Sequence, residues 1–114
     1  MSIPDEGYPL AAAVSPRLQV SETTDSTNAD LVKAVAAGPE QWPHLSLILT
    51  TDQRAGRGRL DRTWTAPPGT ALAVSVLVRV DGLPVAARGW VPLVAGAAMT
   101  RAVRDQLRGT PHRV

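Results

Sequence analysis

The sequence predicts a sheet layered with helices, of the α/β or α+β class. Three observations support this class: residues after Thr27 have helical spacing, the runs 45–51 and 71–80 have the length and branched side chains of strands, and a second helical run begins near Val91. Because helical and extended runs alternate along the chain, we expect them to form layers around one core.

The composition is that of a soluble globular protein with one domain or part of one. The chain has 114 residues, of which 44% are hydrophobic and 19% are charged. Twelve basic residues barely exceed ten acidic ones, so a pervasive nucleic-acid surface is not implied. The absence of cysteine excludes disulfides, thiol catalysis and thiolate metal sites, and two histidines make a poor metal set.

Nothing in the sequence suggests export or a membrane role. Proline, glycine and acidic residues between Pro4 and Pro9 interrupt any apolar leader, and no run of about 18 apolar residues could cross a bilayer. We expect a cytoplasmic protein that does not bind membranes.

The first half of the chain contains one predicted helix between two predicted strands. Residues 1–20 form a leading segment without a sustained period, and a short strand is predicted at 18–21. Thr27 is expected to open a helix, with Asp30 completing an imperfect capping box, and Gly38 and Pro39 to end it. The next strand is predicted at 45–51.

The second half begins with a predicted buried strand at 71–80, where valine recurs at alternate positions. An Asp-Gly turn follows, and a helix with an apolar stripe is predicted from Val91 to Leu107. Pro92 suits its first turn and Gly109 its end. Two tryptophans outside the candidate site, Trp42 and Trp90, are predicted to be packing residues.

The segment from Gln53 to Trp64 joins the predicted strands and carries most of the chemical information. It reads Gln-Arg-Ala-Gly-Arg-Gly-Arg-Leu-Asp-Arg-Thr-Trp, with four arginines, two glycines and an indole. Arginine presents a planar fork of donors to anions, and glycine lets the backbone close around them. The segment lacks the ending of a Walker A loop and the spacing of a dinucleotide fingerprint. Phosphate, carboxylate and nucleic acid all stay open as ligands, beside a solvated basic loop.

A second candidate is the polar cluster Ser26-Thr27-Asn28 at the start of the first predicted helix. Short polar side chains and free backbone amides at that position could hold a small polar group. A simple helix cap explains the same residues, so this cluster alone does not identify a ligand.

Taken together, the two segments resemble the catalytic domain of the biotin protein ligases. The resemblance rests on Thr-Asp-Ser-Thr-Asn-Ala-Asp-Leu at 24–31, followed about twenty residues later by the arginine segment 53–64, and it continues through 67–80 into the second helix. It implies a mixed sheet flanked by helices, related to the class II aminoacyl-tRNA synthetases. It also implies ATP-dependent formation of biotinyl-5'-adenylate, with Mg²⁺ at ligands that stay unknown, and transfer of biotin to a lysine of a carrier domain.

The resemblance also implies a role for each matching residue. Arg57 and Arg59 would be catalytic, neutralising the biotin carboxylate and the α-phosphate, and would contact both biotin and adenylate. Arg62 and Trp64 would bind the phosphates and the adenine. Biotin itself would lie against the polar cluster, the glutamine and the two glycines, which are Ser26, Thr27, Asn28, Gln53, Gly56 and Gly58.

One departure from the family pattern concerns the end of the chain. The family's Lys-Trp-Pro-Asn-Asp strand and later SH3-like domain have no counterpart here, and 110–114 would be the first residues of that strand. We therefore interpret 21–114 as an N-terminal part of the catalytic domain and expect the isolated chain to be incomplete.

Partners follow from the resemblance alone. It implies a biotin carboxyl carrier domain of an acyl-CoA or pyruvate carboxylase and leaves a homodimer open, while the absence of room for a winged helix before Ser26 predicts no DNA binding. Two alternatives stay open. A lipoate or octanoate protein ligase is the nearest enzyme, and an Arg/Gly-loop nucleic-acid-binding module belongs to another class.

Overall fold

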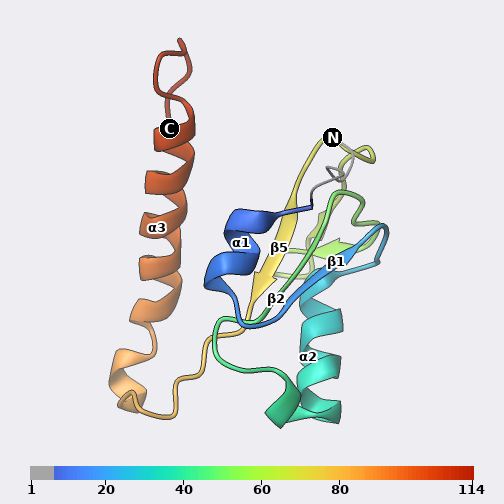
Figure 1. Ribbon diagram of the computed structural model, residues 1–114, viewed down its shortest axis with the longest axis vertical. Helices are drawn as coiled ribbons and strands as arrows, with labels where there is room; N and C mark the ends of the chain where they lie inside the picture. Colours follow the sequence, from blue (N-terminus) through green and yellow to red (C-terminus); the bar gives the residue numbers. More distant parts are fainter. Residues whose placement is uncertain (1–6) are drawn as a thin grey trace. The chain divides into compact units, whose positions relative to one another are not determined.

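The computed structural model describes residues 7–114, which divide into a sheet-containing unit and a helical unit (Figure 1). The first unit is Met1–Arg79 and the second is Val80–Val114. The first six residues of the predicted leading segment lie outside the described residues. The sheet and both segments of the candidate site belong to the first unit.

The predicted mixed sheet is present. Its three strands, β1 (Leu18–Ser21), β2 (Leu47–Thr50) and β5 (Ala73–Val76), lie in the order β1-β2-β5. β2 pairs parallel with β1 and antiparallel with β5, with Ile48 opposite Gln19 and Ser75. β1 lies at the predicted residues. β2 begins later than predicted because Leu45 is in the left-handed region (φ 69°) and the Ser46 amide donates to the Pro43 carbonyl in a turn.

Helix α2 (Thr27–Ala37) follows the predicted residues, but its cap differs from the prediction. The residue that caps it is Ser26, whose hydroxyl oxygen accepts from the Ala29 amide at 3.2 Å; Thr27 is already helical and turns its hydroxyl elsewhere. Gly38 ends the helix as predicted and is followed by the short helix η1 (Pro39–Gln41). α2 packs against β2 and β5.

The core lies between α2 and the sheet. Leu31, Trp42 and Ile48 are buried there, with Leu77 and other partly buried apolar residues packed against them. Trp42 is a packing residue, as predicted. The Arg17 guanidinium lies 3.9 Å from the centre of its ring, which covers the indole with a cation.

Truncating the central strand residue is expected to destabilise this unit strongly. Ile48 is 1% exposed, so Ile48→Ala removes buried methyl groups and leaves a cavity, at a cost of about 2–5 kcal/mol. The free energy of unfolding in urea measures this loss. Val32→Ala, on the exposed side of α2, is the matched control and should cost less than about 1 kcal/mol; equal losses would contradict the assigned core.

Strand β5 differs from the prediction of a buried strand. Ala73, Ser75 and Leu77 are half-buried, whereas Val74 and Val76 are 39% and 47% exposed. Successive side chains of a strand point to opposite faces, and α2 covers only one of them. The apolar run therefore indicated a strand that is present, but the strand is shorter than the predicted 71–80 and its environment is less buried than predicted.

Helix α1 (Pro9–Val14) was not predicted from the sequence. It begins with a proline, which suits a first helical position, but it buries none of its residues. All six of its residues are apolar, so it lacks the alternation of polar and apolar faces that reveals α2.

The second unit contains the short helix η2 (Val85–Ala87) and the long helix α3 (Trp90–Gln106). Pro92 lies in the first turn of α3, and Gly109, at φ 80°, follows its end, both as predicted. Two predictions are wrong. Trp90 is 66% exposed and does not pack, because α3 buries none of its residues. Residues 110–114 form turns and coil, not the start of a strand, and hydrogen bonds to Thr110 and its hydroxyl hold them.

Across residues 7–114, every helix is too short or too polar to cross a bilayer.

Candidate functional site

A cavity of about 320 Å³ in the first unit brings the two predicted segments together. Its polar lining residues come from the start of α2, the end of β2, β5 and the arginine segment. Its apolar lining residues lie mainly at 71–74. The lining residues are Ser26, Thr27, Asn28, Thr51, Gln53, Arg57, Trp64, Thr65, Ala66, Ala71, Leu72, Ala73, Val74 and Ser75.

The polar cluster and the arginine segment are far apart in sequence but lie next to each other in the structure. Beyond the ends of β1 and β2 the parallel pairing continues as a bridge between Thr24 and Gln53. The Thr24 amide donates to the Asp52 carbonyl at 3.1 Å, and the Ala55 amide donates to the Asp25 carbonyl at 2.7 Å. The polar cluster and the arginine segment are therefore held side by side by backbone hydrogen bonds.

Gln53 is fixed within this junction by Thr27. Its Oε1 accepts from the Thr27 amide at 2.9 Å and from the Thr27 hydroxyl at 3.3 Å. The Thr27 hydroxyl also lies 2.9 Å from the Ser75 Oγ, which links α2 to β5. Thr27 is 3% exposed, so its hydrogen bonds are shielded from water, whereas Gln53 and Ser75 are half-buried and line the cavity.

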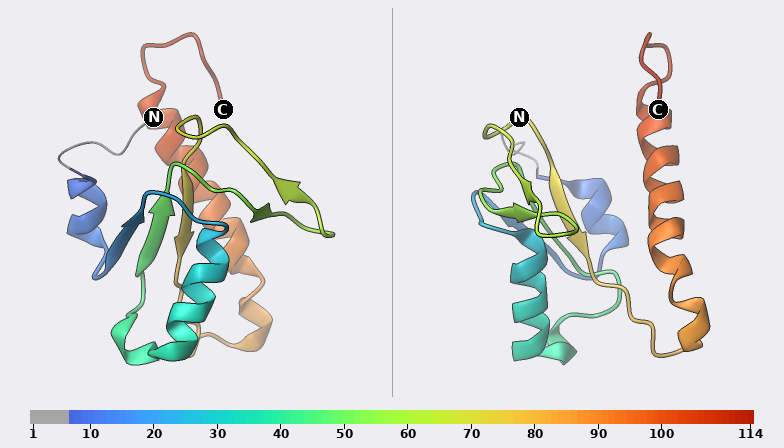
Figure 2. Two further views of the ribbon diagram at one scale, coloured as in Figure 1. Left: turned by 90° about the vertical axis from the view of Figure 1, so that its right-hand side faces the viewer. Right: turned by 180° about the vertical axis from the view of Figure 1, so that it is seen from behind.

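The arginine segment forms a hairpin, which the sequence did not reveal. β3 (Gly56–Arg57) pairs antiparallel with β4 (Thr63–Trp64), and the Gly58 amide donates to the Arg62 carbonyl at 2.7 Å. Figure 2 shows this hairpin beside the start of α2. Its turn places two consecutive residues, Leu60 and Asp61, in the left-handed region at φ 57° each.

Such a turn strongly favours Asn-Gly, so Leu60-Asp61 stores backbone strain. We expect Asp61→Gly to stabilise the closed hairpin by about 1 kcal/mol, because glycine adopts a positive φ without steric cost. Hydrogen exchange of the Gly58 amide should slow about fivefold. Asp61→Ala is the control, since it removes the carboxylate and keeps the strain; an equal slowing in both variants would show that charge, not backbone strain, is responsible.

Gly56 is packed too closely for any side chain. A Cβ at this position would lie 2.5 Å from the Gln53 Nε2, 2.9 Å from the Trp64 Cβ and 3.1 Å from the Trp64 carbonyl oxygen. Gly58 is less crowded, with a nearest atom at 3.4 Å, the Cβ of Arg62. Because Gly56 has no side chain, Gln53 and Trp64 can both pack directly against it.

Ten site residues were predicted, and six of them line the cavity: Ser26, Thr27, Asn28, Gln53, Arg57 and Trp64. The other four, Gly56, Gly58, Arg59 and Arg62, lie on the same hairpin outside the lining. Trp64 is 66% exposed, so much of its indole is free to contact a ligand.

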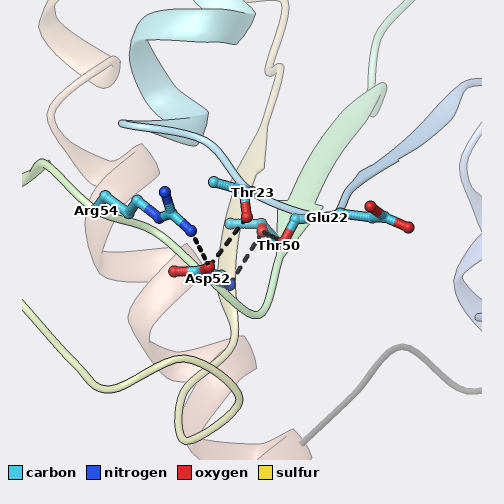
Figure 3. Close-up of polar contacts among 5 residues, drawn as sticks. All are labelled: Glu22, Thr23, Thr50, Asp52 and Arg54. Atoms are coloured by element: carbon cyan, nitrogen blue, oxygen red, sulfur yellow. Dashed lines mark hydrogen bonds and ion pairs between the residues drawn. The ribbon is translucent and has the colours of Figure 1, made fainter.

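The arginines of the segment differ in their partners. Arg54 pairs with Asp52, with the Arg54 Nη2 3.1 Å from the Asp52 Oδ2 (Figure 3). Within residues 7–114, Arg57, Arg59 and Arg62 form no ion pair. These three guanidinium groups are consequently available to bind an anion, whereas the guanidinium of Arg54 is already paired with Asp52.

Asp52 also anchors the end of β2. It accepts from the Thr23 hydroxyl at 3.0 Å, and its amide donates to the Thr50 hydroxyl oxygen at 3.1 Å (Figure 3). The hydrogen bond from Arg54 lowers the pKa of the Asp52 carboxyl below its ordinary value of 3.8, against the smaller opposing effect of desolvation, and the bond from Thr23 lowers it further.

The lowered pKa makes a contribution to stability that depends on pH. Ionised Asp52 stabilises the fold fully above its ordinary pKa, and this contribution is lost as pH falls through the lower pKa of the folded state. We expect wild type to exceed Asp52→Asn in stability at pH 7 and the gap to narrow below about pH 4. Urea unfolding from pH 7 to pH 2 measures it; a constant gap would contradict the role of ionisation.

No group of three or more histidine, aspartate or glutamate side chains within residues 7–114 is arranged to hold a metal ion. The ligands of the expected Mg²⁺ accordingly stay unassigned.

Sequence reasoning missed Ser75 and the apolar lining residues at 71–74. Ser75 is the single polar residue in the run from Ala71 to Leu77, and its inward register on β5 was readable from the alternation. Its contact with Thr27 depends on how α2 lies on the sheet, which no local pattern specifies.

Comparisons with known proteins agree on one family. The family model described as biotin/lipoate A/B protein ligase matches residues 20–113. The chain is 40% identical over 95 residues to the biotin--[acetyl-CoA-carboxylase] ligase of Mycobacterium tuberculosis, and the match covers 83% of this chain and 35% of that protein. The chain thus spans about a third of the length of this curated relative.

Two solved structures of the biotin protein ligase of Leishmania major are also similar. The complex with biotin has a TM-score of 0.61 and 33% identity, over 79% of this chain and 34% of that one. The complex with biotinyl-5-AMP has a TM-score of 0.62 and 33% identity, over 81% and 36% of the two chains. These values show that the chain shares their fold over most of its length.

Proposed function

The chain belongs to the biotin/lipoate A/B protein ligase family, and we propose that its cavity is the biotin pocket of a biotin protein ligase. The proposed reaction joins the biotin carboxylate to the α-phosphate of ATP, forming biotinyl-5'-adenylate and releasing pyrophosphate. A carrier lysine amine then attacks the mixed anhydride, forming an amide and releasing AMP. This proposal concerns the activity of the whole protein. The chain covers about a third of the length of the curated relative.

The observation that carries the proposal is the mixed lining of the cavity, which combines polar side chains with apolar surface. The head of biotin is a cyclic urea, which needs donors for its carbonyl oxygen and acceptors for its N–H groups. Ser26, Gln53 and Ser75 supply both kinds of group, while Ala71 and Ala73 provide apolar surface for the rest of the ring system. A volume of about 320 Å³ suits a ligand of this size.

The free arginines support adenylate chemistry at the same site. Arg57 lines the cavity, and Arg59 and Arg62 lie along the same hairpin. Their charge can neutralise the approach of the biotin carboxylate to an anionic phosphate and the departure of pyrophosphate. We assign Arg57 and Arg59 to catalysis, Arg62 to the phosphates and the exposed indole of Trp64 to adenine.

The partners of the reaction are part of the proposal. They are ATP, Mg²⁺ bound to its phosphates, and a carrier lysine of a biotin-dependent carboxylase. We further propose that residues 21–114 are the N-terminal part of the catalytic domain and that the protein acts in the cytoplasm. A lipoate ligase is less well supported, because the relatives described above are biotin ligases.

Formation of the labelled intermediate tests the proposal. Incubation of the whole protein with α-labelled ATP, Mg²⁺ and biotin is expected to give biotinyl-5'-adenylate, and the same incubation with lipoate is expected to give no adenylate. Adenylation of lipoate without adenylation of biotin would overturn the assignment in favour of the other branch of the family.

A further inference from the structure

Two threonines hold Gln53 in place, one at its side chain and one at its backbone. Thr27 holds the side chain, as described above. Thr24 holds the backbone through the parallel bridge. The Thr24 amide donates to the Asp52 carbonyl at 3.1 Å, and the Thr24 carbonyl accepts from the Arg54 amide at 2.9 Å. Because these two bonds lie on either side of Gln53 in the sequence, the position of Thr24 determines the position of the Gln53 backbone.

The side chain of Thr24 is held in turn by Asp30, which lies in the first turn of α2. The Thr24 hydroxyl donates to the Asp30 Oδ2. Both residues are half-buried, so water competes less with this bond than it would at the surface. A hydrogen bond to a carboxylate is also stronger than one between neutral groups. Asp30 forms no ion pair within residues 7–114 and lies outside the cavity lining, so Thr24 is the group that its carboxylate holds.

We propose that Asp30 is a positioning residue, which acts through Thr24 to hold Gln53 in its place at the cavity. This inference rests on the proposed function. Since Thr27 and Asp30 both belong to the first turn of α2, one helical turn orients the side chain and the backbone of Gln53. Asp30 therefore affects biotin affinity without touching biotin.

Calorimetric titration of the whole protein with biotin tests the inference. We expect Asp30→Ala to weaken biotin binding about tenfold, because the loss of the bond to Thr24 lets the Gln53 backbone shift. Thr24→Val, which replaces the hydroxyl with a methyl group, should have a similar effect, and the double variant should bind no more weakly than the weaker single variant. Asp30→Asn keeps an acceptor oxygen and should retain binding within about threefold.

Kinetics distinguish positioning from a purely structural role. In Asp30→Ala the KM for biotin should rise about tenfold, while the KM for ATP should change less than about twofold, because Gln53 is assigned to biotin alone. Glu22→Ala is the matched control. It removes an exposed carboxylate from the segment that contains Thr24, and Figure 3 shows this side chain pointing away from Asp52. Its effect on biotin affinity should be less than about twofold.

The possible failures have different signatures. A lower free energy of unfolding in Asp30→Ala with unchanged biotin affinity would overturn the inference, because Asp30 would then only stabilise the fold. A double variant whose loss is the product of the two single losses would also overturn it, as would an equal loss in Asp30→Asn and Asp30→Ala. If Asp30→Ala does not fold, Thr24→Val takes its place in both measurements. Wild-type whole protein that does not bind biotin would refute the proposed function itself.

Discussion

Gly56→Ala is expected to weaken biotin binding at least about tenfold, because a methyl group at this position displaces Gln53 from the cavity. The added Cβ would lie 2.5 Å from the Gln53 Nε2. Trp64 atoms on the opposite strand are also close to it and would prevent the Cβ from moving away from Gln53. Moving Gln53 also breaks its two hydrogen bonds with Thr27. Calorimetric titration with biotin measures the effect.

Gly58→Ala is the matched control on the same hairpin strand. A Cβ there would make ordinary contacts of 3.4 Å and more, with Arg62 and Trp64. We expect its effect on biotin affinity to be less than about threefold. Equal losses in the two variants would indicate that the hairpin backbone as a whole, and not the position of Gln53, determines affinity.

Arg57→Ala is expected to slow biotinyl-5'-adenylate formation about 100-fold while changing biotin affinity much less. Arg57 lines the cavity and lacks an ion-pair partner within residues 7–114, so its charge is free to stabilise the phosphate as pyrophosphate leaves. The hydrogen bonds to the urea ring of biotin, which is neutral, do not need this charge. Pyrophosphate exchange into ATP measures the rate, and calorimetry measures the affinity.

Arg54→Ala separates this effect from the general positive charge of the segment. Arg54 is three residues away and is paired with Asp52, so its removal is expected to lower stability slightly and to change the adenylation rate less than about threefold. A comparable slowing in both variants would contradict a specific role for Arg57.

Much of the fold could be predicted where a local pattern reflects a buried face. β1 and α2 lie at the predicted residues, and Gly38 ends α2 as expected. The environment of β5 could not be predicted, because the valines that identify a strand do not show how many of its faces are covered. α1 and the exposure of Trp90 were missed for a related reason, since neither helix buries a residue.

The candidate site was predicted as a set of residues but not as an arrangement. The hairpin escaped prediction because its left-handed positions carry Leu60 and Asp61 in place of the expected Asn-Gly. Ser26 caps α2 in place of Thr27, because the Thr27 hydroxyl hydrogen-bonds with Gln53 and Ser75. These hydrogen bonds join segments that are up to almost fifty residues apart, and no local sequence pattern predicts them.

The central claim is that the cavity between Thr27, Gln53 and Ser75 binds biotin, and calorimetric titration tests it most directly. Biotin, lipoate and a single-stranded oligonucleotide are titrated separately into the protein at two salt concentrations. Our account predicts saturable binding of biotin alone, with an affinity that changes little with salt, because the pocket recognises a neutral urea by hydrogen bonds. Binding of the oligonucleotide without biotin, falling steeply as salt rises, would contradict it.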